Sequence, residues 1–477
     1  MGIMKISRLR IVFPLVVAMI VSTGLSFPLT AAEGFVKGEI IDKALCKADP
    51  EQSYALYLPI DYSIDKKWPI LYAFDPGARG RIPLELFKPA AEKYGYIVVC
   101  SNNSRNGPTE PIQCAIWAVW RDTRARFSID PNRIYSTGFS GGARVASRFH
   151  RLTGNTCAGI IACGAGLSKA IADLGMIKPA AWYGIIGLAD FNYRELTDLD
   201  RAFDETDVLH RVKVIESNHR WPPKEICTHA VEWMEVNAIK KGTRKKDNSL
   251  VQTLYQEALN RAHNLEVADK IYYAADTYEA AQVLFDGLVD TSKAEKKKTQ
   301  LKKSNAYKKF QNDEEKRLQR ERDFIRNYQR ITYFIKNPQT KRVRLEEILR
   351  QLRIDYLLKE ANNTKDIYNS SLAFRMLHDL NIRAGREGGE YLQKGDYEKA
   401  ILFFEISAKT SQVNPFSFYQ LYNLACAYSL SKQKKNALKS LKLAVEAGFK
   451  NRAHMEKDPD LDYIRKEKAF KEIKDNL

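Results

Sequence analysis

The sequence predicts an α/β domain with a mostly parallel sheet, followed by an all-α domain. Between residues 50 and 240, apolar runs typical of buried strands alternate with helical stretches. Beyond residue 249 proline and glycine are sparse, and apolar residues recur with helical periodicity. The 477 residues are too many for one ordinary core, so the length also favours at least two domains.

Charge is distributed unevenly along the chain. Residues 1–240 carry 29 Lys and Arg against 25 Asp and Glu, whereas residues 241–477 carry 47 against 33. A basic helical half is compatible with nucleic acid or an acidic partner, but a solvated basic face is the simpler interpretation. The apolar content of 44% is ample for globular packing and argues against wholesale disorder.

The N-terminus has the pattern of a secretory signal peptide. Three basic residues, Lys5, Arg8 and Arg10, precede a short apolar run over 11–21, and small residues follow up to Ala32. The run is short and interrupted, which argues against a permanent transmembrane anchor. We therefore expect a signal peptide over residues 1–32 and export to the periplasm or the extracellular space.

An exported protein can form disulfides, and six of the seven cysteines precede residue 240. Six cysteines allow fifteen pairings, so sequence alone does not fix the connectivity. Cys100 and Cys114 bracket a loop rich in Ser, Asn, Gly and Pro and form the favoured pair. No Cys or His cluster has metal-site spacing, so we expect no metal and no cofactor.

The expected elements of the first domain follow from these patterns in chain order. Helices are expected at 84–93 and 112–127, and a turn at 129–132. The expected strands lie at 54–58, 70–74, 96–100, 133–137, 159–162, 181–187 and 212–216.

The segment Gly138-Phe139-Ser140-Gly141-Gly142 follows one of these strands and opens a helix of small residues. It fits the G-x-S-x-G pattern, in which a serine sits on a sharp strand-to-helix turn. Glycine suits such a turn because it tolerates unusual backbone angles and close approach of neighbouring chain.

Two further polar residues follow the last expected strands. Asp190 stands three residues after Gly187, and His219 stands three residues after Glu216. The carboxyl ends of parallel strands lie at one edge of a sheet, where ligands bind. Together with Ser140 they give the chain order Ser, Asp, His, which the nucleophile-elbow hydrolases use.

Residues 50–240 resemble the α/β-hydrolase superfamily, and most of all secreted esterases related to polyhydroxybutyrate depolymerases, feruloyl esterases and dienelactone hydrolases. The resemblance rests on the elbow with the following Gly-Ala-Arg-Val-Ala and on the His-x-Trp-Pro that starts at His219. It implies that Ser140 is the nucleophile, His219 the general base and Asp190 the acid that orients the imidazole.

The expected oxyanion hole departs from this family. Relatives commonly carry His-Gly after the strand that supplies it, whereas this chain reads Asp75-Pro76-Gly77. One donor is expected from the N–H of Gly141. Because Pro76 has no N–H, the second is expected from Gly77 or Ala78. Asp75 would disfavour a developing negative charge unless it is turned away or paired with Arg79 or Arg81.

The other candidate residues have simpler interpretations. His150, His210 and His229 are expected to be structural, because they lie on helices or at the wrong end of a strand. The rival acids belong to a charged, helix-like stretch and are expected to be solvated: Asp198, Asp200, Asp204 and Asp207.

The second half begins after a basic linker over 241–249, and residues 250–477 are expected to be helical. An internal repeat aligns Tyr272, Tyr278, Ala281 and Phe285 with Tyr391, Tyr397, Ala400 and Phe404, and a further copy places Ala437 37 residues after Ala400. Residues 388–404 and 424–444 resemble tetratricopeptide repeats, with the clearest repeats over 381–450. Such repeats hold a peptide or protein segment, or only pack against the first domain.

The stretch over 293–330 carries 14 basic and 6 acidic residues and is expected to form one long helix with a solvated basic face. Few aromatic residues accompany it, so we expect no nucleic-acid binding. Residues 457–462 and the amphipathic stretch after them are expected to cap the helical domain.

These observations predict an exported serine hydrolase that cleaves a small or polymeric carboxylic ester through an acyl-enzyme on Ser140. A protein partner is expected at the repeats. Two alternatives stay open: a degenerate hydrolase scaffold that carries a protein-binding module, and a serine peptidase with the same three residues. The fold hosts many chemistries, so the sequence does not identify the substrate.

Overall fold

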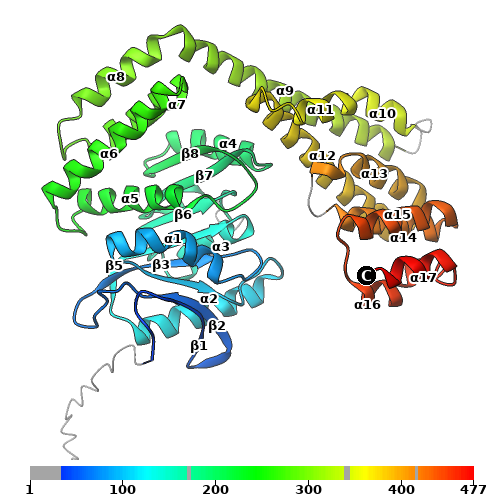
Figure 1. Cartoon of the computed structure of the whole chain (residues 1–477), viewed down its shortest axis with the longest axis horizontal. Helices are drawn as coiled ribbons and strands as arrows, with labels where there is room; N and C mark the ends of the chain where they lie inside the picture. Colours follow the sequence, from blue (N-terminus) through cyan, green and yellow to red (C-terminus); the bar gives the residue numbers. More distant parts are fainter. Residues whose placement is uncertain (1–33, 169–172, 338–343, 414–416) are drawn as a thin grey trace, which may run out of the picture.

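The computed structural model describes residues 34–168, 173–337, 344–413 and 417–477 (Figure 1). The expected signal peptide over 1–32 lies outside these ranges. Within them the expected fold class is confirmed: an α/β unit with a mostly parallel sheet precedes a long series of helices. In the described part of the chain, no helix combines the length and the apolar character needed to cross a membrane.

The sheet has eight strands in the order β1-β2-β4-β3-β5-β6-β7-β8. Strand β2 is antiparallel to both of its neighbours, and the strands from β4 to β8 in this order are parallel. This is the α/β-hydrolase arrangement. The strands are β1 (Ile40–Cys46), β2 (Asp49–Tyr57), β3 (Trp68–Phe74), β4 (Ile97–Ser101), β5 (Ile129–Phe139), β6 (Gly159–Cys163), β7 (Ala181–Ala189) and β8 (His210–Asn218).

Helices cover both faces of this sheet, which is why β3, β4 and β6 are buried along their whole length. One face carries α1 (Arg81–Tyr94) and α5 (Lys224–Lys240). The other carries α2 (Thr109–Arg126), α3 (Gly141–Leu152) and α4 (Tyr193–Asp204). Two apolar cores therefore flank the sheet.

The sheet departs from the expectations at two places. The turn expected at 129–132 belongs to β5, where Ile129 pairs with Trp68 before the register shifts. The turn preference survives locally, because the Asn132 N–H donates to Asp130 Oδ1 (2.9 Å) at the irregularity between Ile129 and Ile134. Strand β1 is not expected from the sequence, since its exposed edge position leaves only a weak apolar pattern.

The remaining helices form two groups in Figure 1. The first group continues the core around α1 and α5, so no break in packing follows residues 241–249. It contains α6 (Asn248–Val267), α7 (Ile271–Phe285) and α8 (Ser292–Lys303). Helix α9 (Asn305–Lys336) then connects the first group to the second.

The second group consists of antiparallel helix pairs with small residues where the helices cross. Ala400, Ala425, Ala437 and Ala444 are fully buried there. A Cβ added to Gly388 would lie 2.7 Å from the ring of Phe404. The helices are α10 (Leu345–Gln351), α11 (Ile354–Ala361), α12 (Ile367–Gln393), α13 (Tyr397–Lys409), α14 (Phe418–Leu430), α15 (Lys434–Glu446), α16 (Arg452–Lys457) and α17 (Lys468–Asp475).

Two expectations for the helical half are wrong. The basic stretch over 293–330 is not one helix, because Ser304 ends α8 and its side chain caps α9. The first copy of the repeat is out of register by seven residues: α7 starts at Ile271 as α13 starts at Tyr397, so Ala274 rather than Ala281 corresponds to Ala400. Seven residues are nearly two helical turns, so residues seven positions apart lie on the same face of a helix. The apolar pattern therefore matches almost equally well in either register.

Cys100 and Cys114 do not form a disulfide, and all seven cysteines are free thiols. Cys100 is buried in β4 within the core, whereas Cys114 is exposed on α2. The loop between them is instead held by its own hydrogen bonds, such as those from the N–H groups of Asn103 and Ser104 to Ser101 Oγ.

Candidate active site

The residue at the centre of the elbow, Ser140, adopts φ 53° and ψ −121°, between β5 and α3. This conformation is rare for a residue with a side chain. It is held by a hydrogen bond from the Ser140 N–H to the carbonyl of Cys163 (2.8 Å). The flanking glycines are required, because a Cβ on Gly142 would lie 2.0 Å from the carbonyl oxygen of Phe74.

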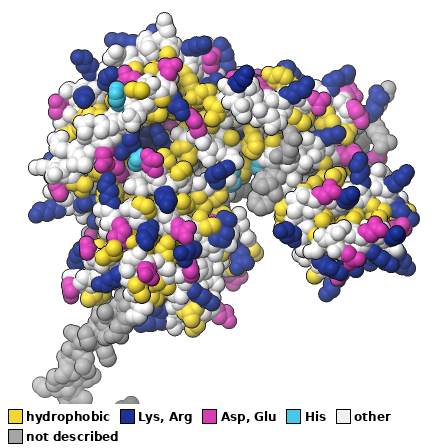
Figure 2. Space-filling view, in the orientation of Figure 1, with side chains coloured by type: hydrophobic (Ala, Val, Ile, Leu, Met, Phe, Trp, Pro, Cys, Tyr) yellow, Lys and Arg dark blue, Asp and Glu magenta, His cyan; other side chains and the backbone are white. Residues whose placement is uncertain are grey.

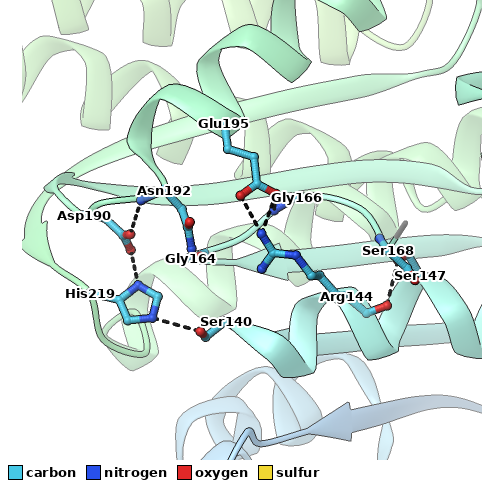
Figure 3. A network of polar contacts seen from close by, with 10 residues as sticks. All are labelled: Ser140, Arg144, Ser147, Gly164, Gly166, Ser168, Asp190, Asn192, Glu195 and His219. Atoms are coloured by element: carbon cyan, nitrogen blue, oxygen red, sulfur yellow. Dashed lines mark hydrogen bonds and ion pairs between the residues drawn. The ribbon is translucent and has the colours of Figure 1, made fainter. Parts of the chain in front are cut away.

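The structure brings Ser140, His219 and Asp190 together in the expected order (Figure 3). Ser140 Oγ lies 2.9 Å from His219 Nε2, and His219 Nδ1 lies 2.8 Å from Asp190 Oδ2. The Asp190 side chain is almost fully buried, while the His219 ring keeps about a fifth of its surface exposed. The three residues follow β5, β7 and β8, so adjoining strand ends position them.

The loop after β7 fixes the orientation of Asp190. Its second carboxylate oxygen, Oδ1, accepts a hydrogen bond from the Asn192 N–H (2.8 Å). Asn192 Nδ2 in turn donates to the carbonyl of Gly164 (2.7 Å). Because Oδ1 accepts this hydrogen bond, Oδ2 is the carboxylate oxygen that contacts the imidazole.

Asp75 is paired with Arg79, one of the two partners expected for it. Arg79 donates through Nε to Oδ1 (2.8 Å) and through Nη2 to Oδ2 (3.0 Å), and Trp221 Nε1 also donates to Oδ2 (2.9 Å). Burial by itself would raise the pKa of Asp75, but these bonds outweigh it and hold that pKa below its ordinary value. Arg81 pairs instead with Asp42 and Glu85.

The expected oxyanion donors differ in whether their N–H groups already donate a hydrogen bond. Gly141 opens α3, and its N–H is among the first four of the helix, which have no partner within it. The N–H of Gly77 donates to Asp75 Oδ1 (2.8 Å), and the N–H of Ala78 donates to the carbonyl of Asp75 (3.0 Å). Either of these would have to turn away from Asp75 to reach a substrate oxygen.

Sequence reasoning missed Asn106, which lies against the elbow. A Cβ added to Gly141 would stand 1.8 Å from Asn106 Oδ1 and 3.1 Å from Nδ2. The Asn106 N–H donates to the carbonyl of Pro76 (2.8 Å), which ties its loop to the segment after β3. Spacing gives no signal for this residue, because its loop reaches the elbow only in the folded chain.

Aromatic rings surround the imidazole of His219. Its centroid lies 4.6 Å from that of Phe139 and 4.1 Å from that of Phe191. Phe191 is also stacked against His378 of α12, with centroids 4.4 Å apart and 3° between the planes. A single aromatic ring therefore separates a side chain of the second helical group from His219.

Helix α12 also contacts the backbone at the end of β7, two residues before Asp190. Arg375, almost fully buried, donates to the carbonyl of Leu188 and forms an ion pair with Glu321 of α9 (2.8 Å). Its guanidinium lies over the ring of Tyr193 (4.2 Å), the first residue of α4. The sequence does not reveal this contact, since its partners are far apart in the chain.

A second polar group lies beside the elbow in Figure 3. Arg144 on α3 forms an ion pair with Glu195 on α4 (2.5 Å), and Glu195 Oε1 accepts a hydrogen bond from the Gly166 N–H (3.1 Å). This pair links the helix that Ser140 opens to the helix that follows Asp190.

The rival residues contact other groups. His210 lies between Asp200 and Asp204, which stand 3.6 and 3.3 Å from its Nε2. Asp198 faces Arg194 and Arg201, and Asp207 pairs with Lys178. The two other histidines belong to helices: His150 is buried in α3, and burial lowers the pKa of His229 on α5 to about 3.

One group of potential metal ligands is present among the described residues. Atoms of Cys426, Asp458 and Asp460 lie within 4.8 Å of one another near the C-terminus. Asp458 accepts a hydrogen bond from the Tyr422 hydroxyl (2.7 Å) and caps the turn at 459–461. These contacts give the group a structural role in joining α14 to the last turns.

Comparison with known proteins gives partial matches. No protein-family model matches the chain. An 85-residue segment, 18% of the chain, is 33% identical to a chloroplastic protein of Arabidopsis thaliana, and it spans only a quarter of that protein's length.

Solved structures match the chain in part as well. An S-formylglutathione hydrolase from Staphylococcus aureus has 13% identity and a TM-score of 0.32, with 38% of this chain and 90% of that chain covered. A ferulic acid esterase has 15% identity and a TM-score of 0.33, with 41% and 97% covered. Est1E from Butyrivibrio proteoclasticus has 12% identity and a TM-score of 0.33, with 42% and 99% covered.

Proposed function

We propose that this chain is an exported serine hydrolase that cleaves carboxylic esters through an acyl-enzyme on Ser140. The observation that carries the proposal is the pair of short contacts in line, Ser140 Oγ to His219 Nε2 (2.9 Å) and His219 Nδ1 to Asp190 Oδ2 (2.8 Å). A serine hydroxyl is a weak nucleophile until a base within hydrogen-bond reach takes its proton.

In the proposed reaction Ser140 Oγ attacks the ester carbonyl while His219 Nε2 accepts its proton. The buried carboxylate of Asp190 keeps Nδ1 protonated and stabilises the imidazolium that forms. His219 then protonates the leaving alcohol, and the acyl group stays on Ser140 Oγ. Water attacks that ester next, with His219 again accepting a proton, and releases the carboxylic acid.

The negative charge on the carbonyl oxygen would be met by the Gly141 N–H at the N-terminus of α3, where the helix dipole also favours an anion. The second donor is proposed to be the N–H of Gly77 or Ala78, released from Asp75 when substrate binds. Pairing of Asp75 with Arg79 and Trp221 supports this, because a compensated carboxylate repels an oxyanion less.

The second helical group is proposed to bind a peptide or protein segment. A groove of about 650 Å³ runs along α13, α14 and α15, lined by apolar residues such as Leu421, Leu424 and Leu443, with Lys439 and Glu446 beside them. The resemblance of residues 388–404 and 424–444 to tetratricopeptide repeats supports the same role. Export rests on the pattern over residues 1–32.

The test is covalent labelling with a fluorophosphonate probe, followed by turnover of an ester panel. We expect one adduct on Ser140, absent from Ser140→Ala, and hydrolysis of esters in preference to matched amides. Absence of an adduct, or an adduct that persists in Ser140→Ala, would contradict the hydrolase proposal and favour the degenerate scaffold. Faster turnover of the amides would favour a peptidase.

A further inference from the structure

A recess lies between the edge of the sheet and helices α6 and α7, and it shares no residue with the site around Ser140. Its volume is about 380 Å³, within the range of sites for small organic ligands. Apolar side chains such as Leu265 and Phe285 line the helical side. Figure 2 shows basic side chains and a histidine between α5 and these helices, with acidic side chains beside them.

The strand side of the recess breaks the usual apolar pattern. In the register of β7 and β8, Arg211 stands opposite Tyr183 and Lys213 opposite Ile185. Tyr183 and Ile185 belong to the core beneath α5, so the two basic side chains point to the covered face of the sheet. A covered face ordinarily carries apolar residues, and departures from that pattern are expected where a site is built.

Three of the four basic side chains of the recess are paired within the described residues. Arg211 pairs with Asp276 (2.8 Å), Arg261 pairs with Glu232 (2.5 Å), and Lys270 pairs with Glu216. Lys213 takes part in no ion pair in the described part of the chain. Glu225 also lines the recess, but it is exposed at the start of α5.

The pKa values of two groups reflect burial in this recess and the basic side chains beside them. Burial, followed by repulsion from Arg211, lowers the pKa of Lys213 to about 8, although attraction to Asp276 offsets part of the shift. Burial, followed by repulsion from Arg261 and Lys213, lowers the pKa of His229 to about 3. An anion in the recess would offset both effects.

We propose that this recess binds an organic monoanion, a carboxylate on an apolar body, with the ammonium of Lys213 as its counter-ion. The carboxylate would face β8, where Arg211 and Lys213 lie, and the apolar body would lie against α6 and α7. The site does not depend on the proposed hydrolase activity, because its ligand is bound and not converted.

A competing explanation exists for Lys213. Strand β8 is an edge strand, and a charge that points inward on an edge strand hinders pairing with another chain. That explanation predicts association of the Lys213→Met variant and no role in ligand binding. The two explanations therefore make opposite predictions for a binding experiment.

The test is calorimetric titration of the full chain with 2-naphthoate and with neutral 2-naphthamide. We expect 2-naphthoate to bind at least tenfold more tightly than the amide, and Lys213→Met to weaken 2-naphthoate at least tenfold. Lys309→Met, which removes an exposed lysine of α9, serves as the matched control and should leave the affinity unchanged.

A second variant, Ala280→Trp, fills the recess without a change in charge and should also abolish binding. It keeps the test decisive if Lys213→Met does not fold. The proposal is overturned if 2-naphthoate does not bind, if acid and amide bind equally, or if both variants keep wild-type affinity. Association of Lys213→Met with unchanged affinity would assign the lysine to edge protection instead.

Discussion

The imidazole of His378 lies parallel to the ring of Phe191, at a centroid distance of 4.4 Å. Phe191 also contacts the His219 ring, at a centroid distance of 4.1 Å, so one aromatic ring links α12 to the candidate base. The helical half thus supports the site through direct contact. This contact and the buried Arg375 lead to the first two predictions below.

Replacing Arg375 by Met should destabilise the protein by about 3 kcal/mol and lower kcat for ester turnover. The loss of stability arises because Glu321 is left as a buried, unpaired charge, and the loss of activity arises because the Leu188 carbonyl loses its donor. Urea unfolding and steady-state kinetics on the same preparations measure the two effects.

The control for this variant is the double variant Arg375→Met with Glu321→Gln. It should recover much of the stability, since no unpaired carboxylate remains, while kcat stays low. Because Arg375 contacts the backbone two residues before Asp190 and does not touch substrate, KM should change less than kcat. Full recovery of kcat in the double variant would show that the contact with Leu188 does not matter.

His378 should make the protein less stable in acid. Burial, followed by repulsion from His219, lowers the pKa of His378 to about 4, while an unfolded chain has the ordinary value near 6.5. Between pH 6.5 and 4 the unfolded state therefore binds more protons, and stability falls as the pH falls through this window. The loss is on the order of 1–2 kcal/mol at pH 5.

The variant His378→Phe should reduce this acid sensitivity and keep the stacking on Phe191. Thermal unfolding measured from pH 7 to pH 4 gives the slope of stability against pH for both proteins. His150, whose pKa burial also lowers to about 4, contributes to the remaining slope. An unchanged slope in His378→Phe would mean that His378 protonates in the folded protein as readily as in the unfolded chain.

Gly142→Ala should cost more than about 3 kcal/mol or prevent folding, because the added Cβ would lie 2.0 Å from the Phe74 carbonyl oxygen. Gly389→Ala on α12 is the matched control. Its Cβ would meet no atom within 4 Å, so helix propensity should raise the stability by about 0.5–1 kcal/mol. Denaturant midpoints of both variants measure the contrast. Equal effects would refute the close approach of α3 and β3.

The seven cysteines should react as free thiols. A thiol reagent should label one group, the exposed Cys114, in the native protein and seven after unfolding. Added reductant should leave the melting temperature unchanged, because it has no bond to break. Fewer than seven thiols in the unfolded, unreduced protein would indicate a disulfide.

Much of the candidate site could be predicted because its residues follow strands whose apolar runs are easily recognised. Ser140, Asp190 and His219 lie directly after β5, β7 and β8, so local patterns and the geometry of parallel strands are sufficient to bring them together. The pairing of Asp75 with Arg79 is among the possibilities that the sequence offers, because the two residues are four positions apart.

The rest depends on contacts between distant segments. Nothing in the spacing of His378 or Arg375 links either residue to a strand end, since that link exists only through the packing of α12. The prediction for Cys100 is wrong because the loop after it resembles a disulfide loop, whereas its own position in a buried strand points to the core. The alignment of the first repeat is wrong because a helical face recurs every two turns.

The shared core of α5, α6, α7 and α8 determines where this protein can be divided. A chain ended after Lys240 would carry Ser140, Asp190 and His219, yet it would expose the apolar surface of α5 that α6 and α7 normally shield. Such a fragment should aggregate. A working boundary between the two halves would therefore have to lie beyond α8.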